Sequence, residues 1–450
     1  MPRAWELAHG GGLDPGWYDY PSLIFLLLAP SQAFADAPSY GAARVVAATL
    51  GLAGVAAAWW LGRAAYGSLA GIVAGAAVAV ATAHVAYSHV AVTDVLLTTL
   101  VTLALAFAVQ GRLEWASVAA GLAASAKYPG VFLAVPLLAL GWSQWRRVAR
   151  GAALAAVAFV LTSPFVVWHG GAAWDDILRV QRLAAEGWLG FENDHPTPLA
   201  FLDRLWESLG PALIVALAGL ALAGRALVLK QPKRSGARAD LAQPSGSVAT
   251  QEELVLKHHK LSVGRADLAL VSFALAYFAY LLTLDAHFDR YVLPLVPVLG
   301  ALAGRVRPLA VATLVLLLVP LAWSIGDVRE LQRTDTRLVA HDWIEANVPR
   351  SATIAVDPST APVTASGVLR LELPGPGRPA DPERVVARLR ELGVEYVVVT
   401  GAVADRARAA AERYPQETRF YDELETNARR LLRVEPGGGL AGPWVAVYRL

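Results

Sequence analysis

Long apolar runs, separated by short polar stretches, dominate the chain up to about residue 325. Such runs, with their flanking residues, reach the roughly 20 residues that a helix needs to cross a bilayer. The pattern predicts about ten spans, near 42–62, 69–88, 90–110, 113–126, 129–141, 148–168, 209–229, 267–284, 291–304 and 308–325. The segment 21–35 is also apolar but short, which favours an interfacial helix.

After Ile325 the hydropathy falls to that of a soluble protein. Helical periodicity near 336–347, 382–392 and 420–431 alternates with strand-like runs at 353–356, 396–399 and 444–448. The Asp-Pro-Glu sequence at 381–383 is typical of a helix start. The predicted fold class is therefore a polytopic α-helical membrane protein with a small C-terminal α/β soluble domain. We divide it into 1–40 with the interfacial helix, a membrane domain 41–325, and the α/β domain 326–450.

The composition agrees with a membrane protein, because 56% of the residues are hydrophobic and 17% are charged, against roughly 25% charged in soluble domains. The chain has no cysteine, which excludes disulfides and thiolate chemistry. Its nine histidines are dispersed and lack the spacing of a metal site. We therefore expect no metal and no cofactor, and no nucleic-acid partner.

Basic residues fall in alternate connections between the predicted spans, and such connections face the cytoplasm. They are Arg63, Arg112, Arg146, Arg147, Arg150, Lys230, Lys233, Arg234, Arg238, Lys257, Lys260, Arg265, Arg305 and Arg307. The other connections, 84–94, 169–208 and 285–291, would then meet on the outer face of the plasma membrane, with the tail 326–450. The segment 231–265 is polar, basic and poor in aromatic residues, so we expect a flexible cytoplasmic loop there.

The turn 84–94 carries a carboxylate and two histidines between two apolar runs. Ionisable groups beside membrane helices are costly and are often placed for function. Thr93 is expected to cap the second helix, which would put Asp94 in its first turn, where the helix dipole favours a carboxylate. Asp94 is our candidate catalytic residue and His89 a weaker candidate for substrate binding, whereas His84 is expected to satisfy a local hydrogen bond. The alternative is an interfacial cap that meets only water and headgroups.

Two cationic stretches would lie on the same face. Lys127 and Tyr128 separate two short apolar runs, and this lysine either snorkels to the surface or pairs with an anion. Arg290 and Tyr291 begin an apolar helix, where the guanidinium offers a fork of donors to phosphate. Arg290 is alternatively an ordinary interfacial anchor.

A third stretch, 14–22, is aromatic and acidic, and in it Asp19 and Tyr20 are candidate binding residues. Together, a carboxylate, a lysine and an arginine on one face describe a site for a lipid-borne phosphate.

These stretches resemble the GT-C glycosyltransferases that use a polyprenyl-phosphate-linked sugar, the group that includes protein O-mannosyltransferases, lipid A aminoarabinose transferases and RgtA/B/C/D-like proteins. The matching stretches are 13–23, 43–46, 87–94, 126–130 and 290–297. The resemblance implies an integral-membrane glycosyltransferase of the cell envelope with an extracytoplasmic active site. Its partners would be the lipid bilayer, a polyprenyl-phosphate-linked sugar donor, and an acceptor glycan, lipid or protein that the sequence does not identify.

The resemblance also implies an inverting displacement at the anomeric carbon. A carboxylate would orient or deprotonate the acceptor, and Lys127 and Arg290 would neutralise the leaving phosphate. The family carries an Asp-Glu pair after a first span, upstream of the Tyr-Pro stretch, and neither that span nor the pair is present here. We therefore interpret 1–40 as the remnant of the first outer loop and expect the true start to lie upstream of Met1.

Two other classes stay open. A transporter would show paired, internally repeated halves with broken helices at mid-membrane, and no such repeat is visible in the sequence. A non-catalytic membrane scaffold that presents the soluble tail is compatible with the missing acidic pair.

Overall fold

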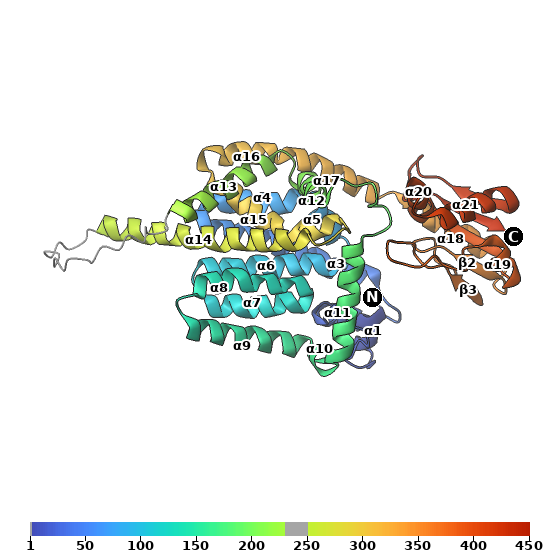
Figure 1. Ribbon diagram of the computed structural model, residues 1–450, viewed down its shortest axis with the longest axis horizontal. Helices are drawn as coiled ribbons and strands as arrows, with labels where there is room; N and C mark the ends of the chain where they lie inside the picture. The colour runs from blue at the N-terminus through green and yellow to red at the C-terminus, as the bar shows by residue number, and fades with distance from the viewer. Residues whose placement is uncertain (1, 230–250) are drawn as a thin grey trace. The chain divides into compact units, whose positions relative to one another are not determined.

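The computed structural model describes residues 2–229 and 251–450, which form two compact units (Figure 1). Of the described residues, the helical unit comprises 2–179, 201–229, 251–283 and 288–324. The sheet unit comprises Val180–Ala200, Leu284–His287 and Ile325–Leu450.

The helical unit begins with a short helix and the predicted interfacial helix, α1 (Pro2–Ala8) and α2 (Leu23–Gln32). The helices of the first half are α3 (Tyr40–Tyr66), α4 (Ser68–Val80), α5 (Thr82–Ser88), α6 (Thr93–Val109), α7 (Leu113–Ala126), η1 (Tyr128–Leu133), α8 (Ala134–Gly141), α9 (Trp145–Thr162) and α10 (Pro164–Trp168). Those that follow are α11 (Gly170–Glu186), α12 (Thr197–Leu209), α13 (Ala212–Leu229), α14 (Gln251–Leu281), η2 (Asp289–Leu295), α15 (Val296–Arg305), η3 (Arg307–Leu309), α16 (Ala310–Leu316) and α17 (Leu318–Leu331).

Within the described residues, four helices are long and apolar enough to cross a membrane. The bent pair α4 and α5, with a 60° angle between its halves, would make a fifth. The prediction of about ten spans is therefore not confirmed. Several predicted spans are shorter apolar helices or are interrupted, as at 128–141 and 289–305, where 3-10 turns precede α8 and α15.

Small residues let these helices approach closely. A Cβ at Gly121 of α7 would overlap the Ala155 carbonyl of α9, and one at Gly219 of α13 would overlap the Leu302 carbonyl of α15. Close backbone approach at small residues is how apolar helices associate in a membrane, where apolar burial between them gains little.

The predicted flexible loop 231–265 falls partly on 230–250, outside the described residues. Its remainder was predicted wrongly, because 251–265 form the first half of α14. This stretch has a single glycine and no proline and is rich in good helix formers.

The sheet unit contains a five-stranded sheet with strand order β3-β2-β4-β7-β5. Its strands are β2 (Thr353–Val356), β3 (Gly367–Arg370), β4 (Tyr396–Thr400), β5 (Arg429–Val434) and β7 (Val445–Arg449). β3, β2 and β4 are parallel, and β7 runs antiparallel to β4 and β5. A separate parallel pair joins β1 (Thr334–Asp335) to β6 (Leu440–Ala441).

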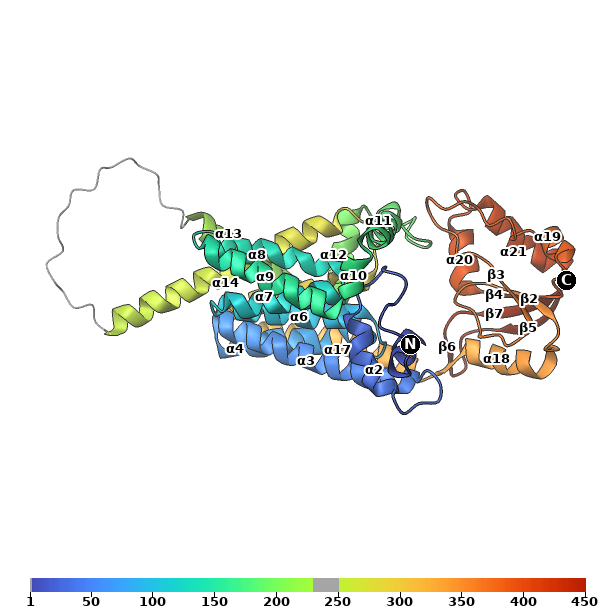
Figure 2. The same ribbon diagram turned by 90° about the horizontal axis from the view of Figure 1, so that it is seen from below.

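Helices cover both faces of this sheet (Figure 2). α18 (Thr336–Asn347) packs on one face, and α19 (Val386–Glu391), α20 (Gly401–Ala409) and α21 (Pro415–Asn427) pack on the other. The predicted helix at 336–347, the strand at 353–356 and the α/β character of the tail are confirmed. The helix predicted at 382–392 begins only at Val386, because Asp381 accepts from Glu383 N and Glu372 N and so closes a turn.

Candidate active site

The candidate site forms where three apolar helices are interrupted. α7 ends at Ala126, Lys127 is extended, and η1 follows with Pro129 and Gly130. α6 begins at Thr93, and η2 begins at Asp289. Asp94 lies in the first turn of α6 as predicted, but the predicted Thr93 cap is wrong. The cap position belongs to Val92, which has no side-chain hydrogen bond to give.

The structure brings Asp94 and Lys127 together. The Lys127 ammonium donates to Asp94 Oδ1 over 2.6 Å, and the two side chains are 12% and 6% exposed, respectively. A charged pair at this depth is stable only because each partner compensates the other. The sequence left two alternatives for Lys127, snorkelling to the surface or pairing with an anion. The structure shows pairing, and the anion is Asp94 of the same chain.

Tyr291 stands between two cations. The Lys127 ammonium is 4.8 Å from the Tyr291 ring centroid, and the Arg290 guanidinium is 5.7 Å from it. Tyr20 also faces Lys127, at 6.0 Å from its ring centroid, and Phe288 lies 4.2 Å from the Arg290 guanidinium. Within 2–229 and 251–450, no carboxylate forms a salt bridge with Arg290. The site therefore presents two positive charges near one aromatic ring. The charge of Lys127 is neutralised by Asp94, and that of Arg290 is not, among the described residues.

A hydrogen bond fixes the start of η2. The Tyr87 hydroxyl of α5 donates to Asp289 Oδ1 over 2.7 Å, and the same oxygen accepts from the Arg290 backbone N–H over 2.9 Å. Asp289 thus ties the turn 84–94 to the residue that carries the free guanidinium. The sequence placed Tyr87 and Asp289 near the site but gave them no role.

The acidic stretch 14–22 forms a second polar group with α11. Asp176 accepts from the Tyr18 backbone N–H over 2.7 Å, and Arg179 donates to both Asp176 and Asp19. Hydrogen bonds from Arg179 and Tyr18 hold the pKa of Asp176 below its usual value. Burial raises the pKa of Asp19, against the opposing charge of Arg179. The Asp19 carboxylate thus forms a salt bridge with Arg179.

Tyr128 connects the two polar groups. Its hydroxyl donates to the Tyr18 carbonyl over 2.7 Å, while its chain neighbour Lys127 reaches Asp94. The segment 18–20 is thereby held against η1, with Tyr20 on the Lys127 side.

The two histidines of the turn are placed apart from these contacts. His89 is exposed at the end of α5, and its Nδ1 bonds with the Val85 carbonyl at 2.7 Å. His84 is buried, and its Nε2 has no hydrogen-bond partner among the described residues, so the local bond expected for it is missing at that atom.

Sequence reasoning missed the tyrosines of α14. Tyr280 packs on Phe132 of η1 with ring centroids 4.8 Å apart, and Tyr277 meets the same ring at 6.1 Å. Aromatic residues within an apolar run resemble ordinary core residues, so no sequence signal separated them from the other aromatic residues of 267–284. The described residues contain no group of three His, Cys, Asp or Glu side chains that could hold a metal ion.

Comparison with known protein families identifies the family to which the chain belongs. The sequence model of glycosyltransferase family 87 matches residues 17–250, more than half of the chain. The chain belongs to glycosyltransferase family 87. The predicted resemblance to membrane glycosyltransferases is confirmed, and no curated protein matches this family 87 chain.

Two crystal structures of ArnT from Cupriavidus metallidurans are similar to this family 87 protein. The apo structure aligns over 100% of this chain and 92% of its own, with 14% identity and a TM-score of 0.53. The structure bound to undecaprenyl phosphate aligns over 67% of this chain, with 18% identity and a TM-score of 0.45. There the aligned part spans about half of ArnT, 53% of its length. The apo match supports an ArnT-like fold, and with the apolar helices it identifies a membrane protein.

Proposed function

We propose that this family 87 protein transfers a sugar from a polyprenyl-phosphate carrier to an extracytoplasmic acceptor. The observation that carries the proposal is the placement of Lys127 and Arg290 on Tyr291. An ammonium and a forked guanidinium on one ring are suited to a phosphate that gains charge as it leaves. Their position, where apolar helices are interrupted, suits a phosphate carried by a lipid.

The reaction is a single displacement. The acceptor hydroxyl oxygen forms a bond to the anomeric carbon while the bond from that carbon to the phosphate oxygen breaks, which inverts the anomeric configuration. The bonding pair leaves with polyprenyl phosphate, where Lys127 and Arg290 offset its charge. The acceptor proton passes to a carboxylate acting as general base.

Asp94 remains our candidate for that carboxylate. Its Oδ1 already accepts from Lys127, so the same residue also positions the ammonium. The sugar and the phosphate would contact Tyr20, Tyr128 and Tyr291. The acceptor would contact His89, which is exposed.

The basic residues of the alternate connections support an outward orientation of the site and of the domain 326–450. The boundaries 1–40, 41–325 and 326–450 are part of the same proposal. In this proposal, the membrane domain contains the catalytic residues.

The test supplies purified protein in proteoliposomes with a panel of undecaprenyl-phosphate-linked hexoses and pentoses and a cell-envelope extract as acceptor. Release of undecaprenyl phosphate is measured. We expect the wild type to consume at least one donor, and Arg290→Ala to lose most of that turnover. Arg63→Ala is the matched control, because Arg63 lies over Trp59 of α3, 5.2 Å from its ring centroid, and carries no role in the site. Consumption of nucleotide sugars and of no lipid-linked sugar would overturn the proposal.

A further inference from the structure

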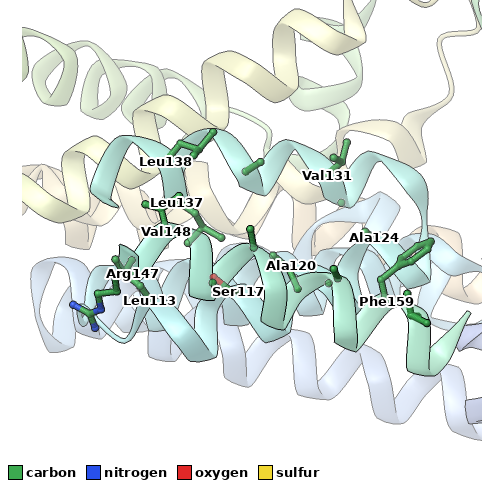
Figure 3. A pocket seen from close by; sticks show the side chains of 18 of the residues that line it. Leu113, Ser117, Ala120, Ala124, Val131, Leu137, Leu138, Arg147, Val148 and Phe159 are labelled. Carbon is green, nitrogen blue, oxygen red and sulfur yellow. The ribbon is translucent and has the colours of Figure 1, made fainter. Parts of the chain in front are cut away.

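An apolar groove runs between α7, η1 with α8, and α9, with a volume of about 550 Å³ (Figure 3). Volumes of this size are typical of small-molecule sites. On α9 the lining residues include Val148, Ala152, Ala155, Phe159 and Val160, which recur at helical spacing and form one stripe. α7, whose 14 residues span about 20 Å, forms the floor.

The groove is open because its walls carry small side chains. Ala134 of α8 and Ala152 and Ala156 of α9 line it and are exposed to it. Larger side chains at these three positions would fill the space between the helices. A groove lined in this way fits a flexible hydrocarbon chain better than a rigid or polar ligand.

One end of the groove lies beside the backbone turn that carries Lys127. Ala124 and Gly130, which line this end, flank Lys127 in sequence, and the Gly130 backbone N–H donates to the Lys127 carbonyl over 2.9 Å. The backbone turn that carries Lys127 therefore also contributes to the groove wall, through Gly130.

The other end offers no free charge to a headgroup. Arg147 lies there, and its guanidinium donates to both Glu114 carboxylate oxygens, over 2.9 and 3.0 Å, and to the Gly111 carbonyl over 2.9 Å. An anionic headgroup at this end would have to displace Glu114. The cations available to a phosphate lie at the Lys127 end.

We propose that the groove binds the prenyl chain of the lipid carrier. The inference rests on the proposed function, because it takes the phosphate at Lys127 and Arg290 as the starting point of that chain. From there the chain would enter beside Ala124 and Gly130 and run along α7 towards Arg147. A chain longer than the groove would leave it between α8 and α9, where Leu138 is exposed.

The test measures binding of two probes, undecaprenyl phosphate and the short geranyl phosphate, to the full-length protein in nanodiscs. Ala152→Trp fills the middle of the groove, and Ala134→Trp fills it from the opposite wall. Ala153→Trp is the matched control, because Ala153 is exposed on the same helix but does not line the groove. We expect both groove variants to bind undecaprenyl phosphate at least tenfold more weakly than the wild type. Geranyl phosphate, which occupies only the end near Lys127, should bind equally to all four proteins.

The outcomes separate the two proposals. If the wild type binds neither prenyl phosphate, the proposed function fails and this inference with it. If the wild type binds undecaprenyl phosphate and both groove variants bind it equally well, the inference alone fails. Loss of a co-purified phospholipid from the groove variants, with undecaprenyl phosphate affinity retained, would likewise overturn it and assign the groove to a membrane phospholipid.

A second measurement does not depend on the variants folding. Undecaprenyl phosphate with a photoreactive group midway along its chain should label peptides from 134–160 in the wild type. Labelling confined to other helices would contradict the inference.

Discussion

Lys127 and Asp94 form a buried ion pair of 2.6 Å between two helix ends that are 33 residues apart in the chain. Removing one partner of such a pair leaves an uncompensated charge, which typically costs about 3–5 kcal/mol. Because Lys127 also faces Tyr291, and Tyr291 faces Arg290, the pair fixes one of the two cations of the candidate site.

Asp94→Asn should reduce sugar transfer by about 10²–10⁴-fold if Asp94 acts as the general base. The amide keeps the shape of the side chain but cannot accept the acceptor proton. Turnover in proteoliposomes gives the size of the loss, and the split between kcat and the KM for the donor gives its origin. A raised KM with unchanged kcat would assign Asp94 to positioning Lys127, and near-normal values of both would reduce it to a structural partner.

Lys127→Met should destabilise the helical unit by about 3–5 kcal/mol, because it leaves the Asp94 carboxylate buried and unpaired. Adding Asp94→Leu should restore most of that stability, since both charges are then replaced by apolar groups. Thermal unfolding of the single and double variants in the same detergent measures both changes. The double variant should remain inactive, and activity in it would exclude Lys127 from phosphate binding.

Hydrophobic periodicity predicted where most helices lie but not which of their ends meet. Asp94, Lys127 and Arg290 are each conspicuous in the sequence because a charge beside an apolar run is costly. Their pairing depends on how α6, η1 and η2 pack, which no single segment encodes. Tyr277 and Tyr280 were missed for the same reason, because only their packing on Phe132 distinguishes them.

The errors in the tail have local causes. β5 was merged into the helix predicted at 420–431, because Arg429 and Arg430 make this strand resemble a charged helix end. Charged residues are common on edge strands, where they discourage pairing with other chains. Within the described residues, β5 is one edge of the five-stranded sheet.

Tyr87→Phe should raise the KM for the lipid-linked donor by about tenfold, since a hydrogen bond to a charged group is worth about 1.5–3 kcal/mol. The Tyr87 hydroxyl holds Asp289, which in turn accepts from the Arg290 backbone N–H. Donor titrations at saturating acceptor measure the effect. Tyr40→Phe is the control, because Tyr40 is exposed at the start of α3. Equal KM values for both variants would exclude Tyr87 from positioning Arg290.

Arg384→Ala should destabilise the sheet unit by about 3–5 kcal/mol. Arg384 is fully buried, pairs with Asp357 at 2.8 Å, and donates to the Tyr421 hydroxyl and the Glu372 carbonyl, both over 2.8 Å. Burial raises the pKa of Asp357, so loss of its arginine leaves a carboxylate that is costly to ionise. Hydrogen exchange of β4 in the full-length protein reports the change. Arg388→Ala, which removes an exposed pair with Glu391, should alter it little.

The charge pattern predicts the sidedness of the membrane domain, and the absence of native cysteine makes it testable. Ser143 is exposed in the turn between α8 and α9, beside the basic residues Arg146 and Arg147, and Ser351 is exposed before β2. With Ser143→Cys, an impermeant maleimide should react only after the cells are lysed. With Ser351→Cys, it should react with intact cells once the outer envelope is opened. The reverse pattern would place the candidate site on the cytoplasmic face, where the acceptor would have to be an intracellular molecule.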